Sequence, residues 1–116
     1  MKVVRIGDIE AQDDSENRIF RGKVSIQRVI GENTGEFRVI VVHFSPGAVN
    51  VFHTHTSDQV LYVTEGKGIV ATETEEVTVT PGAVILLPAG ERHWHGATRD
   101  SAFSHIAVMP PGETSF

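Results

Sequence analysis

β-branched residues dominate the apolar part of this sequence. It contains 16 Val, 9 Ile and 10 Thr against 3 Leu. Branching at Cβ restricts side-chain rotamers in a helix and suits the pleated surface of a sheet. The nearest approach to a helical stripe, residues 9–20, is too polar and too rich in Asp to bury one face. The chain is therefore expected to fold almost entirely as β-strands.

Short apolar runs recur along the chain, separated by turn residues such as Pro81-Gly82 and a Gly-bounded turn at residues 31–35. Many short strands at this spacing predict an antiparallel sandwich or barrel. The acidic stretch at residues 10–16 is expected to be an exposed loop. The expected strands are residues 21–30, 37–44, 59–64, 69–74, 77–79, 83–87 and 102–109.

Size and charge limit the classes of function. A chain of 116 residues and 12.7 kDa suits one domain around one core. Its net charge of -5 and the lack of a basic run argue against nucleic acid or an anionic membrane surface as a partner. No apolar stretch is long enough to span a bilayer, and the N-terminus lacks the apolar segment of a signal peptide. Because Cys is absent, disulfides and thiolate metal sites are excluded, and a cytoplasmic location is expected.

The capacity for chemistry near neutral pH is concentrated in 6 histidines. Two pairs, His53 with His55 and His93 with His95, have one intervening residue each. Residues two apart on a strand project to the same face, so both rings of a pair can point at one centre. Gln59 follows the first pair at the same parity. Imidazole is a common ligand of Zn, Fe, Mn, Cu and Ni, so the pairs indicate a metal site, with half-buried or surface histidines as the alternative.

At the level of motifs the sequence resembles the cupins, small double-stranded β-barrels of the jelly-roll type. Their first motif is Gly, five residues, His-x-His, three or four residues, Glu, six residues and Gly. Residues 47–66 match it with every spacing intact, but Gln59 takes the Glu position. The second motif is Gly, five residues, Pro-x-Gly, two residues, His, three residues and Asn. Residues 82–97 match it, with Ala97 in the Asn position. The resemblance implies an all-β, double-stranded β-helix with one cupin domain over residues 1–116.

The same resemblance implies that His53, His55, Gln59 and His93 hold one divalent metal ion. A Glu ligand would neutralise one unit of the metal's charge, whereas an amide oxygen neutralises none. The ion would keep its formal double charge and act as a stronger Lewis acid. A neutral ligand set also disfavours an oxidised metal, which argues against oxygenase chemistry. The alternative for Gln59 is a strand residue whose amide hydrogen-bonds the barrel rim.

A narrower similarity connects the sequence to small bacterial monocupins related to the cupin-type (R)-selective hydroxynitrile lyases, and to cupins associated with carboxymuconolactone decarboxylases. It rests on residues 53–59, 90–96 and 104–107. Those lyases hold manganese or another divalent ion with three His and one Gln, and they cleave a cyanohydrin to a carbonyl compound and cyanide. The similarity implies manganese, with Zn, Fe, Ni or Cu as alternatives, and it implies acid–base roles for His105 and His95. Otherwise His95 would orient a ligand or close the rim, and His105 would be a satisfied core histidine.

Four functions remain open. Three of them place a small molecule inside the barrel: a metal-dependent lyase for a small hydroxy or carbonyl compound, a metal-dependent dioxygenase, and a non-catalytic binding protein. The fourth is a metal-stabilised structural protein. The absence of a dense Arg/Lys cluster argues against a phosphosugar. A cavity with few charged groups is expected, which would suit a small and rather hydrophobic substrate.

The remaining expectations concern assembly and the residues outside the motifs. A homodimer is expected because small barrels leave strand edges that need cover, with residues 2–6 as the exchanged or edge-pairing strand. His43 has no place in either motif and is expected to be structural or exposed. Trp94 is opposite in parity to its two His neighbours and is expected to pack outside the cavity.

Overall fold

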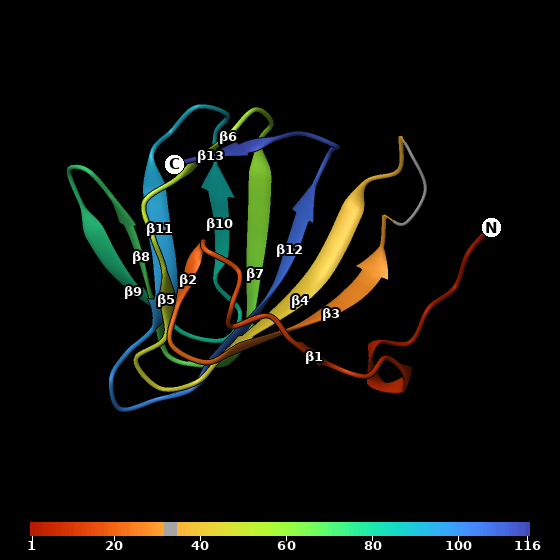
Figure 1. The fold of residues 1–116 in the computed structure, drawn as a ribbon, viewed down its shortest axis with the longest axis horizontal. Helices are drawn as coiled ribbons and strands as arrows, with labels where there is room; N and C mark the ends of the chain where they lie inside the picture. The colour runs from red at the N-terminus through yellow and green to blue at the C-terminus, as the bar shows by residue number, and fades with distance from the viewer. Residues whose placement is uncertain (32–34) are drawn as a thin grey trace.

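Alternation of apolar and polar residues along short segments produces two antiparallel sheets that share one core (Figure 1). The computed structural model describes residues 1–31 and 35–116. Within this part of the chain, no helix is long or apolar enough to cross a membrane. The one helical element noted there is a single 3-10 turn, η1 (Ile6–Asp8).

The larger sheet has the strand order β1-β3-β4-β12-β7-β10. Its members are β1 (Gln12–Asp13), β3 (Val24–Ile30), β4 (Arg38–Phe44), β12 (Phe103–Met109), β7 (Gln59–Gly66) and β10 (Val84–Leu87). The smaller sheet has the order β2-β5-β11-β8-β9. Its members are β2 (Phe20–Arg21), β5 (Val49–Asn50), β11 (His93–Ala97), β8 (Gly68–Thr72) and β9 (Glu76–Val79). A separate ribbon pairs β6 (Thr54–His55) with β13 (Thr114–Ser115).

This architecture confirms the predicted all-β fold, and each of the expected strands overlaps an observed one. The acidic stretch at residues 10–16 differs in part from expectation, because it includes β1, which pairs with β3 at the sheet edge. Residues 2–6 pair with no strand of the described chain, so their pairing with a second chain stays a prediction. Of the turn expected at 31–35, residues 32–34 lie outside the described residues.

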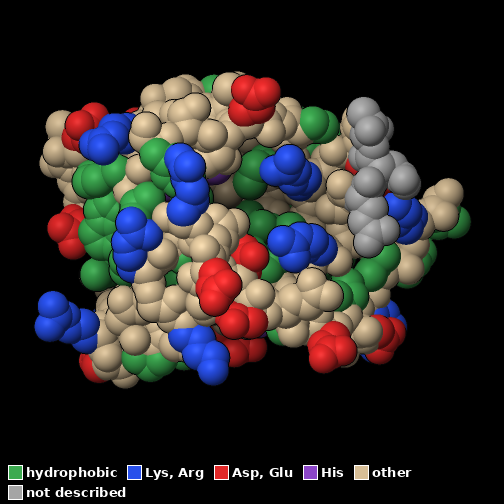
Figure 2. Space-filling view, in the orientation of Figure 1, with side chains coloured by type: hydrophobic (Ala, Val, Ile, Leu, Met, Phe, Trp, Pro, Cys, Tyr) green, Lys and Arg blue, Asp and Glu red, His purple; other side chains and the backbone are tan. Residues whose placement is uncertain are grey.

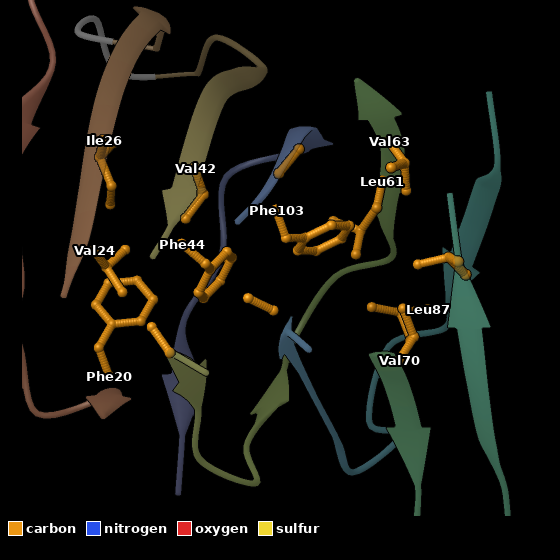
Figure 3. Packing of buried hydrophobic residues seen from close by; sticks show 14 of the residues in the cluster. Phe20, Val24, Ile26, Val42, Phe44, Leu61, Val63, Val70, Leu87 and Phe103 are labelled. Carbon is orange, nitrogen blue, oxygen red and sulfur yellow. The ribbon is translucent and has the colours of Figure 1, made fainter. Parts of the chain in front are cut away.

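The core lies between the sheets and is centred on aromatic rings (Figure 3). Phe44 of β4 is 2% exposed, and its ring centroid lies 5.9 Å from those of both Phe20 and Phe103. Burial of one such ring stabilises the fold by about 1.5–3 kcal/mol. Two-residue periodicity puts Val42 of the same strand on this inner face as well. The inner face of β4 therefore forms the wall on which the site is built.

The outer face of the same strand carries His43, which confirms its expected structural role. Its Nδ1 lies 2.7 Å from Ser104 Oγ and its Nε2 lies 2.7 Å from Gln27 Oε1. The Gln27 amide in turn donates to the carbonyls of Ile6 and Ile9, at 3.1 and 2.8 Å. His43 thus helps to hold the N-terminal segment against the back of the large sheet, away from the cavity.

Two glycines allow backbones to approach closely next to the site. A Cβ at Gly96, in β11, would lie 2.5 Å from the carbonyl oxygen of Ala48. Gly66, at the turn from β7 to β8, has a φ of 75°, and a Cβ there would lie 1.8 Å from the carbonyl oxygen of Ala102. Side chains at these positions would push β11 away from β5, or β7 away from β12.

Candidate metal centre

Three histidines from two distant segments meet at one end of the cavity. His53 precedes β6, His55 lies in it, and His93 begins β11. A two-residue bridge joins the segments: the His53 amide donates to the His93 carbonyl at 2.9 Å, and the reverse bond measures 3.0 Å. The ring centroids of His53 and His93 are 4.3 Å apart, and those of His53 and His55 are 4.8 Å apart. One nitrogen from each of the three rings lies within 4.8 Å of the other two.

Hydrogen bonds to Nδ1 determine which nitrogen each ring turns toward the others. The Nδ1 of His53 lies 2.6 Å from the Val51 carbonyl, and the Nδ1 of His93 lies 2.8 Å from the Glu91 carbonyl. Because a carbonyl only accepts, both rings donate from Nδ1 and keep a lone pair on Nε2. The Nδ1 of His55 lies 3.0 Å from Thr114 Oγ1, so the ribbon strand β13 orients the third ring. This is the arrangement by which proteins orient metal-binding histidines.

Gln59 is the fourth candidate ligand, and its side chain is buried beside the three rings. Its residue is 5% exposed, and its amide is close enough to His55 to influence the pKa of that ring. Gln59 Oε1, His55 Nε2 and His93 Nε2 are buried atoms without a hydrogen-bond partner among the described residues. One buried acceptor without a partner costs about 1–3 kcal/mol. A divalent cation would give all of these atoms a partner, so the donor set fits a metal.

Burial keeps the imidazoles of this cluster uncharged. Burial in the first place, and neighbouring imidazoles in addition, lower the pKa of His53 and of His55 from 6.5 to about 4. Burial also lowers the pKa of His93. The rings are therefore neutral at pH 7, which is the form that binds metal.

His95 and His105 face each other across the cavity from opposite sheets. Their residues are 3% and 1% exposed, and their ring centroids are 4.8 Å apart. A bulge separates Ser104 from His105 in the pairing of β12 with β7, and the extra residue, Thr64, lies in β7. The alternation within β12 is therefore undisturbed, and His105 keeps its inward direction. Trp94, which lies between His93 and His95 in the sequence, is half-buried and does not line the cavity, as expected.

Asn50, which the sequence analysis did not single out, contacts His95 twice. Its Oδ1 accepts the His95 backbone N–H at 2.8 Å, and its Nδ2 lies 3.2 Å from His95 Nε2. Nδ2 can only donate, so Nε2 accepts and a neutral ring carries its hydrogen on Nδ1. Within the described residues, that Nδ1 and both ring nitrogens of His105 lack partners. The available signal was a polar residue in the otherwise apolar run 48–51, directly before the His pair.

Burial also perturbs the proton affinity of these two rings. It lowers the pKa of His105 from 6.5 to about 4. The pKa of His95 lies well below its usual value, chiefly because of burial and then because of the neighbouring His105. Buried titratable groups with free hydrogen-bonding atoms at a cavity wall are typical of functional sites.

The cavity itself has a volume of about 410 Å³, which suits one small molecule. Its walls include Ile26, Ile40, Val42, Phe44, Ala107 and Met109. Its charged lining residues are Asp14, Arg28 and Arg38. The lining thus holds few charged groups, as expected, but the two arginines were not predicted. Each stands at inward parity within an apolar strand, which is the signal that could have identified it.

Figure 2 shows one face of the molecule with a hollow in it. Lys and Arg side chains gather around this hollow, and a histidine is just visible inside it. The basic residue within the second motif does not line this cavity. Arg92 stacks on the Phe52 ring at 4.4 Å and pairs with Glu73 at 3.5 Å. The basic groups of the cavity therefore come from β3 and β4 rather than from the motifs.

The chain is similar in sequence and in fold to known proteins. The chain is 43% identical over 69 residues to (R)-mandelonitrile lyase of Granulicella tundricola, which covers 59% of this chain and 53% of the lyase, or about half of its length. A cupin-like protein from Thermotoga maritima superposes with a TM-score of 0.86 at 27% identity, covering 92% of this chain and 85% of that one. A predicted oxalate decarboxylase from the same organism shares the fold, with a TM-score of 0.82 at 22% identity and coverage of 94% and 98%. The model of the Cupin domain family matches residues 40–109, and the chain belongs to that family.

Proposed function

We propose that this cupin binds one divalent metal ion through His53, His55, Gln59 and His93, and that it is a lyase for a small hydroxy or carbonyl compound. The observation that carries the metal site is the convergence of four neutral side chains, of which His55 is half-buried and the other three are buried, and three of which hold an atom without a partner among the described residues. The identity to (R)-mandelonitrile lyase supports the reaction class. Manganese is the proposed ion, with Zn, Fe, Ni or Cu as alternatives.

The metal, when bound, supplies a Lewis acid that polarises a substrate oxygen. The chain's own residues supply the proton transfers that such a cleavage requires. As a hydroxyl-bearing carbon releases its leaving group, the hydroxyl proton departs and the leaving carbon gains a proton. Both ring nitrogens of His105 lack partners among the described residues, and the unprotonated one of the neutral ring can accept the first proton; His95 presents its Nδ1–H as a donor. Ile40, Val42 and Phe44 of β4 add apolar side chains to the cavity wall.

Elemental analysis tests the metal site. The protein is purified without a chelator or a nickel column, and metal per chain is measured for wild type, His53→Ala, His93→Ala and the control His43→Gln. We expect about one ion per chain in wild type and in the control, and loss of the ion in the other two variants. Full metal content in both His53→Ala and His93→Ala would refute the ligand set.

The identity of the metal then directs the activity assay. Manganese or zinc leads to cyanohydrin-type substrates, with release of the aldehyde and cyanide as the measured products. Iron or copper leads to oxygen-uptake assays, which would detect the dioxygenase alternative. A metal-loaded protein that binds such compounds without converting them would be a non-catalytic binding cupin.

A cytoplasmic homodimer completes the proposal. Exposed apolar side chains lie in register on the outer face of β7 and β10, with Val84 opposite Tyr62 and Leu86 opposite Val60. Tyr62 is 46% exposed and Leu86 is 60% exposed, and a second copy would cover them. Sedimentation of wild type and Leu86→Glu tests this, and a monomeric wild type would exclude it.

A further inference from the structure

We propose that Arg28 and Arg38 form an anion-binding end of the cavity, and that the natural ligand is a small carboxylate that also carries a hydroxyl or carbonyl oxygen. The assignment of a hydroxyl or carbonyl oxygen to the ligand rests on the proposed metal site, which would receive that oxygen. The anion-binding end of the cavity rests on the two arginines alone.

Strand register brings the two arginines together. Arg28 of β3 pairs with Ile40 of β4, and Arg38 lies two residues before Ile40 on the same face of β4. Such diagonal positions are roughly 7–8 Å apart at the backbone, within the reach of two long side chains. Arg28, Ile40 and Arg38 all line the one cavity that His53, His55 and Gln59 also line. A single small molecule can therefore contact both ends.

The two guanidinium groups are available to a ligand. Neither makes an ion pair or a side-chain hydrogen bond within residues 1–31 and 35–116. Two other arginines are engaged: Arg18 stacks on the Phe116 ring, and Arg21 donates to backbone carbonyls. A free guanidinium beside a cavity offers a planar fork of donors that matches a carboxylate.

Charge in the lining favours an anion. The lining contains two guanidinium groups and one carboxylate, that of Asp14, which already accepts a hydrogen bond from Asn17 Nδ2 at 3.3 Å. The lining of this cavity therefore carries a net positive charge, although the whole chain has a net charge of -5. A divalent ion held by four neutral donors would add to this positive potential, so a neutral ligand would leave it uncompensated.

Two arginines without a surrounding basic cluster suit a carboxylate better than a phosphate. One carboxylate has two oxygens and one unit of charge, which a single forked contact and a neighbouring guanidinium satisfy. Its attachment to a carbon bearing a hydroxyl or carbonyl oxygen would place that oxygen toward the histidine end of the cavity. The ligand class is therefore a small hydroxy acid or oxo acid.

Calorimetric titration with mandelate and mandelamide tests the proposal. The two probes share a carbon frame and a hydroxyl group and differ in the charged carboxylate. Each is titrated into wild type, Arg28→Gln, Arg38→Gln and the control Arg99→Gln, which alters an exposed arginine outside the cavity lining. We expect mandelate to bind at least about tenfold more tightly than mandelamide in wild type and the control, and to lose most of this preference in the other two variants.

Titrations of metal-free and metal-loaded protein separate this inference from the proposed function. Preference for mandelate in the metal-free protein, lost in Arg38→Gln and partly restored in Arg38→Lys, supports the anion end even if the chain binds no metal. A chain that binds metal but takes both probes equally well would refute the inference and leave the metal site standing. Equal losses in Arg99→Gln and Arg38→Gln would refute it as well. Tighter binding of inorganic phosphate than of mandelate would refute the carboxylate assignment.

Discussion

Asn50 holds His95 at two points, the backbone N–H at 2.8 Å and the ring Nε2 at 3.2 Å. The backbone contact determines which end of the Asn50 amide is the oxygen, because an N–H can only donate. The nitrogen end therefore faces the ring, and the ring hydrogen is placed on Nδ1. A short strand of the smaller sheet, β5, thus sets the tautomer of a histidine in its neighbour β11.

Replacing Asn50 by Asp should reverse this tautomer. One carboxylate oxygen still accepts the His95 N–H, but the other accepts from Nε2 instead of donating to it. We expect the hydrogen to move to Nε2, visible in ¹⁵N chemical shifts of the imidazole in metal-free protein, together with a loss of turnover. Asn50→Ala is the comparison, since it leaves neither tautomer preferred. An Nδ1–H ring in Asn50→Asp would contradict the assignment.

Gln59→Glu should keep the metal and slow the reaction. A carboxylate in place of the amide neutralises one unit of the metal's charge, which strengthens binding and weakens the Lewis acid. We expect an unchanged or higher metal affinity in competition with a chelator, and turnover lower by on the order of tenfold. An unchanged rate would show that the neutral ligand set has no bearing on reactivity.

The metal-free protein should lose stability as the pH falls below 6.5. The pKa of His105 is about 4 in the folded chain against 6.5 for a free imidazole, since burial disfavours the charged ring. Between these values the unfolded chain binds the proton more readily, so the free energy of unfolding is highest above pH 6.5 and declines toward pH 4. His105 alone accounts for about 2 kcal/mol at pH 5. Urea unfolding at pH 7, 6 and 5 measures this loss, and equal midpoints would contradict it.

His105→Leu should stabilise the protein while abolishing turnover. Both ring nitrogens are buried without partners among the described residues, and an apolar side chain of similar size removes that cost of about 1–3 kcal/mol. Metal content should stay at the wild-type level, because this ring lies outside the proposed ligand set. His105→Ala would instead leave a cavity and lower the melting temperature. A Leu variant that fails to fold would support the alternative of a structural core histidine.

Gly96→Ala should destabilise the fold by about 2 kcal/mol or more. Its Cβ would meet the Ala48 carbonyl and the Val49 side chain at 2.5 and 2.7 Å, forcing β11 away from β5. Gly7→Ala is a matched control, because a Cβ there meets nothing within 4 Å. Denaturant midpoints compare the two, and similar values would show that the strands can yield at Gly96.

Much of the sheet structure was predictable because its rules are local. The run 59–64 alternates apolar residues with a period of two, and it becomes β7, with Leu61 and Val63 buried and Tyr62 exposed. Two-residue strands such as β5 were not predicted, since their pairing depends on partners far away in the chain. The position of residues 2–6 was not predictable for the same reason.

Local backbone geometry also explains why the histidine pairs could be recognised. Residues two apart on an extended segment share a face, so His53 and His55 were expected to act together before any fold was known. The motif spacing added Gln59 and His93. Each of these residues lies in the same cluster in the folded chain.

The charge and hydrogen-bonding pattern of the cavity depends on contacts that no local rule contains. Arg28 and Arg38 join the histidines because β3 and β4 form the wall of the larger sheet, and Asn50 reaches His95 because β5 pairs with β11. Side-chain periodicity is a property of neighbouring residues and can be read from the amino-acid order. Register between strands distant in sequence follows from the packing of the whole core, which decides the side chains that share the cavity with the histidines.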